Sequence, residues 1–327
     1  MPPTPLIIGA GAGLVSAALF ASAATASALA GVLFYLAPLP VCLAGLGWGG
    51  MAAIVAALSG AVVIAAALGG GTAAVYAISI AMPAALLTHL ALLSRPAVTP
   101  QGQVMGATEW YPPGRLVTWA ALMAGALAAI LILFIGYDQD AYRETIRQIL
   151  EHSAFKELDR DGTLLTPENV TKLAAVLARA LPAAVAVVWL VITLFNLWIA
   201  GLIVDASGRA LRPWPDLNAF ELPNGLVVVF AIALAASFLP GLAGLIATGL
   251  SGALLLAYVL QGLAVIHVYS RGAPMRGLLL ATVYIGILLL GWVALLVAIL
   301  GLAEPLFGIR ERANRNAPPP DDDDATT

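Results

Sequence analysis

Residues 51–94 read MAAIVAALSGAVVIAAALGGGTAAVYAISIAMPAALLTHLALLS, and neither this stretch nor residues 1–50 before it contains an Asp, Glu, Lys or Arg. The first charged side chain of the 327-residue chain is Arg95. A water-soluble domain needs charged groups on its surface to stay solvated, so a run of this length excludes one. Its natural solvent is a lipid bilayer.

The composition of the whole chain agrees with a membrane location. It is 61% hydrophobic and 10% charged, whereas soluble domains are about 25% charged. About 20 apolar residues cross roughly 30 Å of hydrocarbon, and helices satisfy their own backbone there. The alternating pattern of a membrane barrel is absent. We therefore predict an all-α fold, a polytopic helical membrane bundle with eight or nine spans.

Hydropathy divides the chain into five regions. Residues 1–94 form an uncharged membrane region of about four spans, and 95–137 a polar loop with the fifth span. Residues 138–172 form a hydrophilic insert, 173–303 a C-terminal membrane region, and 304–327 a disordered tail with four consecutive Asp residues. The expected spans are 6–28, 31–48, 51–69, 73–94, 116–136, 173–204, 224–239, 248–269 and 277–303.

The arginines in short loops predict the orientation. The loops 95–115, 205–222 and 270–276 each carry two arginines, and all three fall on one side if every span is real. Basic short loops stay in the cytoplasm. The insert 138–172, with eight carboxylates against five basic residues, then lies outside the cytoplasm. We expect a multi-pass protein of the bacterial cytoplasmic (inner) membrane.

The tail conflicts with this orientation. Arg310, Arg312 and Arg315 also favour the cytoplasmic side, but a single ninth span would place them outside. Two solutions stay open: either 277–303 is a re-entrant pair of helices, or the number of spans is wrong.

Small residues recur at helix-packing spacing in the first region. Gly9 and Gly13, and also Gly45 and Gly49, are four residues apart. Such pairs let helix backbones approach closely in lipid. They can form a dimer face or pack inside the bundle, and the many internal contacts of such a chain favour internal packing.

Four polar side chains in apolar spans are candidate ligand-binding residues: His89, Asn196, Gln261 and His267. The alternative is a hydrogen bond to a neighbouring helix, or an interfacial position for the histidines. Exposing an amide to hydrocarbon costs roughly 4–8 kcal/mol, so we expect both amides to face the bundle interior. Motifs of an intramembrane hydrolase or an ATPase are absent, and we expect no enzyme.

The insert contains a segment, 157–168, that resembles an EF-hand calcium loop. Leu165 gives no ligand at the ninth position, and the first position holds Glu where Asp is usual. The alternative, which we favour, is an acidic turn before a helix capped by Thr166. Calcium is the one cofactor that the sequence suggests, with ligands at Glu157, Asp159, Asp161, Thr163 and Glu168.

The loop 212–223 mixes prolines and aromatic residues just before a span. Trp214 and Phe220 are typical of an interfacial aromatic belt. A surface for docking a partner is the alternative.

Three short segments carry a family resemblance: 220–223 (FELP), 261–267 (QGLAVIH), and Gly301 to Glu304 followed by Arg310-Glu311-Arg312. Together they look like the YybS-like family of bacterial membrane proteins, although that family commonly has Asp where this chain has Glu304. The family is distantly similar to the substrate-capturing subunits of energy-coupling-factor vitamin transporters. The resemblance implies a helical bundle that binds a small ligand, with no ligand residue carried over.

Two functions follow as hypotheses. The first is a transporter-like bundle that binds a small molecule and has no ATPase of its own. Its partners would be the lipid bilayer and a cytoplasmic motor subunit or another membrane protein, and no nucleic acid. The second is a membrane scaffold or assembly factor. A midplane cavity with converging polar groups such as Asn196 and Gln261 favours the first, and a core without a cavity favours the second.

Overall fold

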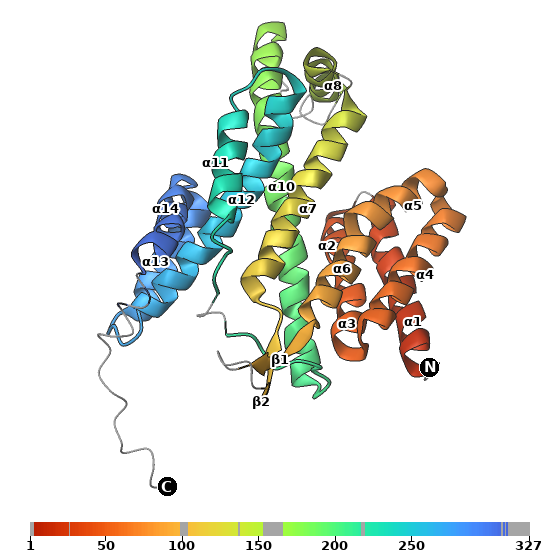
Figure 1. Cartoon of the computed structure of the whole chain (residues 1–327). Coiled ribbons are helices and arrows are strands. Elements are labelled where there is room, and N and C mark those ends of the chain that lie inside the picture. The colour runs from red at the N-terminus through yellow and green to blue at the C-terminus, as the bar shows by residue number, and fades with distance from the viewer. Residues whose placement is uncertain are drawn as a thin grey trace.

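A computed structural model describes residues 3–25, 27–98, 104–136, 138–152, 166–216, 220–308, 310 and 312. These residues form a bundle of helices with one two-stranded hairpin (Figure 1). Seven helical segments are long and apolar enough to cross a membrane, or eight if one bent pair counts as a span. The predicted all-α polytopic bundle is confirmed.

The uncharged region folds into four crossings. Helices α2 and α3 form one crossing that breaks before Pro38, and α5, the π-helical turn η2 and α6 together form another. The bounds are α1 Pro3–Ala21, η1 Ser22–Thr25, α2 Ala28–Tyr35, α3 Pro38–Trp48, α4 Gly50–Leu68, α5 Gly70–Tyr76, η2 Ala77–Ala81 and α6 Met82–Ala91.

Glycines bring α1 and α4 into close contact. A Cβ atom on Gly9 would lie 2.6 Å from the carbonyl oxygen of Ala52, and one on Gly13 would overlap Ser59 and Ala56. Only glycine fits at these positions, so the Gly9/Gly13 spacing packs helices inside the bundle, the alternative that the sequence favoured.

The second half of the chain is built around the longest helix, α10. At 1.5 Å per residue, its 40 residues extend about 60 Å, well beyond the roughly 30 Å of a hydrocarbon core. The amphipathic helix α8 packs against the N-terminal part of α10 through Tyr142 and Ile146. The bounds are β1 Ser94–Val98, β2 Val104–Trp110, α7 Pro113–Ile135, α8 Gln139–His152, α10 Pro167–Ala206, α11 Leu226–Ala236, α12 Gly241–Tyr269, α13 Arg276–Leu289 and α14 Trp292–Phe307.

Two of the nine expected spans are not single helices long enough to cross a membrane. The span expected at 224–239 is α11, whose 11 residues reach only about 17 Å. The span expected at 277–303 is two helices, α13 and α14, which bend by 120° at a break between them. The segment is apolar throughout, so hydropathy alone could not show the reversal. Helix α14 also continues to Phe307, which places Glu304 in a helix and not in the tail.

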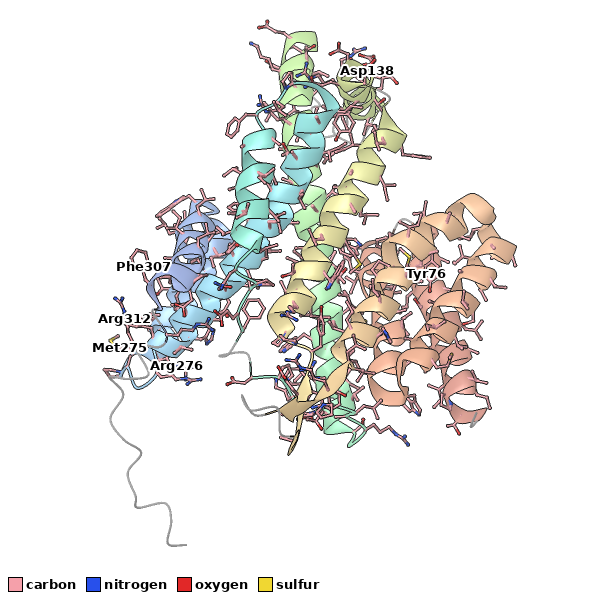
Figure 2. The ribbon with its side chains drawn as sticks, in the orientation of Figure 1. Tyr76, Asp138, Met275, Arg276, Phe307 and Arg312 are labelled. Carbon is pink, nitrogen blue, oxygen red and sulfur yellow. The ribbon has the colours of Figure 1, made fainter. Side chains whose placement is uncertain are left out.

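The bend settles the conflict over the tail. Arg310 donates a hydrogen bond from Nη1 to the carbonyl oxygen of Phe220 at 2.8 Å, so it lies beside the loop that follows α10. Figure 2 shows Arg276 and Arg312 together at one end of the molecule and Asp138 at the other. Of the two open solutions, the chain adopts the re-entrant pair, and the basic segments share one end.

The polar loop expected at 95–115 contains an antiparallel hairpin that the sequence analysis missed. Strands β1 and β2 pair Arg95 opposite Glu109, and the Arg95 Nε donates to the Glu109 carboxylate at 2.8 Å. This hydrogen bond lowers the pKa of Glu109. The neighbouring loop lies against the hairpin, because Arg212 Nη1 donates to the carbonyl oxygens of Ala91 and Tyr111 at 2.8 and 3.4 Å.

Cysteine labelling tests this arrangement of the ends. In intact spheroplasts of a Cys42→Ala background, we expect Asp140→Cys to react with an impermeant thiol reagent. Ser207→Cys and Arg312→Cys should react only after lysis, because both lie at the predicted cytoplasmic end. Labelling of position 312 together with 140 would contradict the re-entrant pair, and labelling of both 207 and 312 without 140 would reverse the orientation.

Candidate functional site

Gln261 of α12 joins two other parts of the chain. Its side chain is fully buried. Its Oε1 accepts a hydrogen bond from the backbone N–H of Leu222 at 2.8 Å, and its Nε2 donates to the carbonyl oxygen of Gly301 at 2.8 Å. Close contact between α12 and α14 makes this possible, since a Cβ on Gly301 would overlap the backbone of Tyr258. The expectation that Gln261 faces the interior is confirmed.

A buried ion pair lies one turn further along α14. Glu304 Oε1 accepts from Arg310 Nε at 2.7 Å, with side chains only 6% and 11% exposed. The Arg310 backbone N–H also donates to this carboxylate at 3.3 Å. A buried ion pair needs both charges to be hydrogen-bonded, and here the Nη1 of Arg310 also donates to the carbonyl oxygen of Phe220.

The segments that suggested a family therefore meet in space. Phe220 and Leu222 from the loop, Gln261 from α12, and Glu304 and Arg310 from the C-terminal pair are joined by one set of hydrogen bonds. Gln261 and Arg310 each hydrogen-bond to the backbone of the loop and also to α14, through Gly301 and Glu304 respectively. These hydrogen bonds hold the loop against the bundle.

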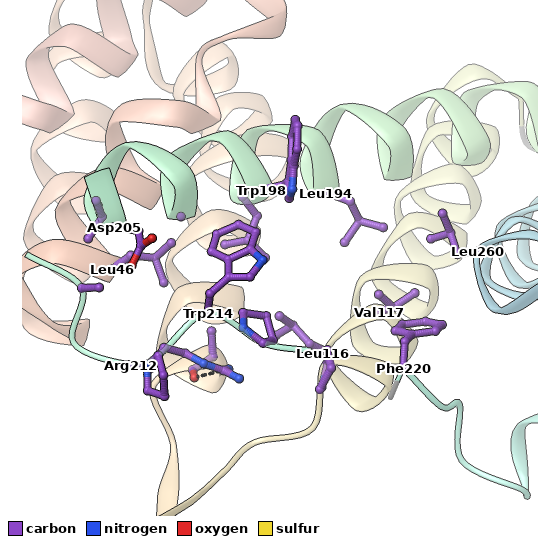
Figure 3. A pocket seen from close by; sticks show the side chains of 18 of the residues that line it. Leu46, Leu116, Val117, Leu194, Trp198, Asp205, Arg212, Trp214, Phe220 and Leu260 are labelled. Carbon is purple, nitrogen blue, oxygen red and sulfur yellow. Dashed lines mark hydrogen bonds between the residues drawn. The ribbon is translucent and has the colours of Figure 1, made fainter. Parts of the chain in front are cut away.

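A cavity of about 430 Å³ lies next to this cluster, between α7, α10, α12 and the loop (Figure 3). Its walls are mostly apolar. Gly201 leaves room for the ring of Trp214, which would lie 2.7 Å from a Cβ there. The lining includes Val117, Leu194, Trp198, Trp214, Phe220 and Leu260.

Few polar groups face the cavity. Arg212 and Asp205 line it, as do His267 of α12 and Tyr284 of α13, whose Nε2 and hydroxyl are hydrogen-bonded at 2.9 Å. Among the described residues Arg212 has no acidic partner within ion-pair distance. Its Nε is buried without a hydrogen-bond partner, and burial lowers its pKa.

The sequence singled out only part of this cavity. His267 lines it, whereas Asn196, Gln261 and His89 are not among its lining residues. Asn196 is buried, as expected, but its Nδ2 donates to the carbonyl oxygens of Tyr35 and Ile192, both at 2.8 Å. His89 is exposed beside Gly50 at the end of α6. The four polar candidates are therefore not brought together.

The loop at 212–220 contributes cavity residues that the sequence analysis did not identify as such. In that analysis Arg212 was used only to predict the orientation in the membrane. Phe220, expected at the membrane interface, is instead buried at 6% exposure. Arg310 holds its carbonyl oxygen, and Gln261 holds the N–H of Leu222 two residues later. The Arg-Pro-Trp-Pro run at 212–215 was the available signal, since prolines hold an aromatic side chain and a cation in a fixed loop.

The calcium loop lies mostly outside the described residues: Glu157, Asp159, Asp161 and Thr163 cannot be placed. Glu168 is described, and its Oε1 accepts from Lys172 at 2.6 Å on the exposed first turn of α10. Thr166 caps that helix, accepting from the N–H of Asn169 at 3.3 Å, and Pro167 begins it. The predicted cap is confirmed. Within the described residues no group of three His, Cys, Asp or Glu side chains could hold a metal ion.

Comparison with protein families gives a match over residues 14–304 to DUF2232, a family described as predicted membrane proteins. The chain belongs to this family. The match covers nearly all of the bundle, including the cavity, Gln261 and Glu304. The comparisons with curated proteins and with solved structures found no match. This member of DUF2232 is a multi-pass membrane protein.

The hydrogen bonds of Gln261 should matter for stability. Gln261→Leu leaves the buried N–H of Leu222 and carbonyl of Gly301 unpaired, which should lower the free energy of unfolding by about 2 kcal/mol or more. Gln148→Leu on the exposed face of α8 should change it by less than about 0.5 kcal/mol. Unfolding of the purified protein in rising concentrations of a denaturing detergent measures both free energies. Equal losses of stability in the two variants would show that the buried amide is dispensable.

Calcium binding by the 157–168 loop has its own test. We expect the capped turn, and therefore the same thermal midpoint in calcium and in chelator. A single EF-hand loop that does bind calcium should have a dissociation constant of about 10⁻⁴–10⁻³ M. A calcium-dependent rise that Glu168→Gln abolishes would contradict the capped turn and establish a calcium site.

Proposed function

We propose that this protein is a transporter-like membrane bundle that binds a small molecule in the cavity between α7, α10 and α12. The cavity is the observation that carries the proposal. Its volume of about 430 Å³ falls in the range of ligand pockets, about 300–1,000 Å³. Its apolar and aromatic lining with a few polar groups is also typical of such pockets.

The position of the cavity supports the same role. It lies at the end of the bundle that holds the basic loops, where Arg209 and Arg271 are exposed. We propose that this end faces the bacterial cytoplasm, and that a motor subunit or another membrane protein docks there. The resemblance of 220–223 and 261–267 to the YybS-like family implies a helical bundle that binds a small ligand, and this implication agrees with the proposal.

The proposal includes no catalysis by the chain itself. Its most buried polar groups are used for structure: Gln261 and Arg310 hold the loop, and Asn196 holds α2 to α10. A ligand would therefore meet apolar walls and Arg212 rather than a set of acid–base groups.

Filling the cavity tests the proposal. Ala264 of α12 lines the cavity, and Ala231 lies on the exposed face of α11. Overpacking a site costs about 1–3 kcal/mol, and the same cost on binding weakens it by a factor of about 5 to 150. After gentle purification from native membranes, mass spectrometry should find a small molecule with the wild type and with Ala231→Phe, and much less with Ala264→Phe.

Two outcomes would contradict a binding role. The same small molecules in all three samples would place them outside the cavity. Co-purifying membrane proteins without any small molecule would favour the scaffold or assembly factor instead. Thermal unfolding of Ala264→Phe shows whether the variant is folded before its loss of ligand is interpreted.

A further inference from the structure

The two charged side chains of the cavity lie together at one end of it. Figure 3 shows Arg212 and Asp205 near one end, and Leu260, Val117 and Phe220 toward the other. His267 and Tyr284 also line the cavity, but each is the hydrogen-bond partner of the other. A molecule that fits this arrangement has a polar head and an apolar tail.

The charge at the polar end favours an anionic head. Arg212 uses Nη1 for the carbonyl oxygens of Ala91 and Tyr111, and its guanidinium lies 5.8 Å from the centre of the Trp110 ring. These contacts fix the group without neutralising it. Its Nε–H is buried with no acceptor, so no acidic or polar side chain offsets the guanidinium from that direction. An anionic group in the cavity beside Arg212 would supply the missing opposite charge.

Asp205 is the one group at this end that opposes an anion. Its residue is exposed, so water screens its carboxylate. It also forms no ion pair with Arg212, in the part of the chain that the structure describes. The half-buried guanidinium therefore acts on a head group more strongly than the exposed carboxylate does.

We propose that the ligand of this cavity is an amphiphile with one anionic head, a carboxylate or a phosphate, and an apolar tail. The head lies at Arg212, and the tail lies between α7, α10 and α12 against Leu260 and Val117. This inference rests on the proposed function, because it names the chemical class of the molecule that the cavity binds.

Four probes with the same dodecyl chain test the head group: dodecanoate, dodecyl phosphate, dodecanol and dodecyltrimethylammonium. Calorimetry on the full-length protein in phosphatidylcholine nanodiscs, with empty nanodiscs subtracted, gives their affinities. We expect at least one of the two anions to bind about tenfold or more tightly than the alcohol and the cation, since a charge-assisted hydrogen bond is worth that much. The tighter anion identifies the head as carboxylate or phosphate.

Variants assign the preference to Arg212. Arg212→Gln should remove it, and Arg212→Lys should keep most of it because the charge remains. Arg209→Gln is the matched control: Arg209 lies in the same loop but stacks on Trp48 and does not line the cavity. Arg209→Gln should keep the full preference.

The outcomes separate this inference from the proposed function. Equal affinity for charged and uncharged probes, or an anion preference that survives Arg212→Gln, overturns the anionic head. If Ala264→Phe still abolishes binding in that case, the cavity remains a binding site. If no probe binds, or if Ala264→Phe changes nothing, the inference and the binding role both fail for this class of molecule. The comparison of probes on the wild type needs no variant to fold.

Discussion

The pair of hydrogen bonds made by Gln261 fixes a stretch of chain that is not helical. Backbone groups without water need partners inside the protein, and residues 220–222 lie outside a helix, before the first turn of α11. Gln261 accepts from one of them and Arg310 donates to another. Phe220 is held in the wall of the cavity as a result. The shape of the cavity thus depends on groups that do not line it.

Helix α10 packs against the first half of the chain on one face and lines the cavity with the other. Asn196 and Trp189 hydrogen-bond to Tyr35 and Ser79 of the first half, at 2.8 and 2.7 Å. Leu194 and Trp198 line the cavity, and at 3.6 residues per turn each lies about 200° around the helix from Asn196. Asn196 is therefore buried without lining the cavity, because it lies on the face of α10 that packs against α2.

Features that depend on composition could be predicted from the sequence, whereas the places where the chain turns could not. The uncharged run required a membrane, and the cost of a bare amide required Asn196 and Gln261 to be buried. Their partners could not be predicted, because Tyr35 and Gly301 are distant in sequence and offer only backbone oxygens. The bend between α13 and α14 was one of two alternatives, raised by the arginines of the tail and not by hydropathy. The shortness of α11 and the hairpin near Arg95 were missed, since apolar or polar content does not show where a chain turns.

The bent pair α13–α14 has a consequence for how the protein is oriented. Since the chain enters and leaves the bundle at the same end, this pair adds an even number of traverses. The direction of every helix before it is then independent of whether the pair is present. A chain shortened after Tyr269 would keep its basic loops on their original side, but it would lose Gly301, Glu304 and Arg310, and with them the supports of the cavity wall. In this fold, the direction of the earlier helices and the integrity of the cavity wall are encoded in separate segments.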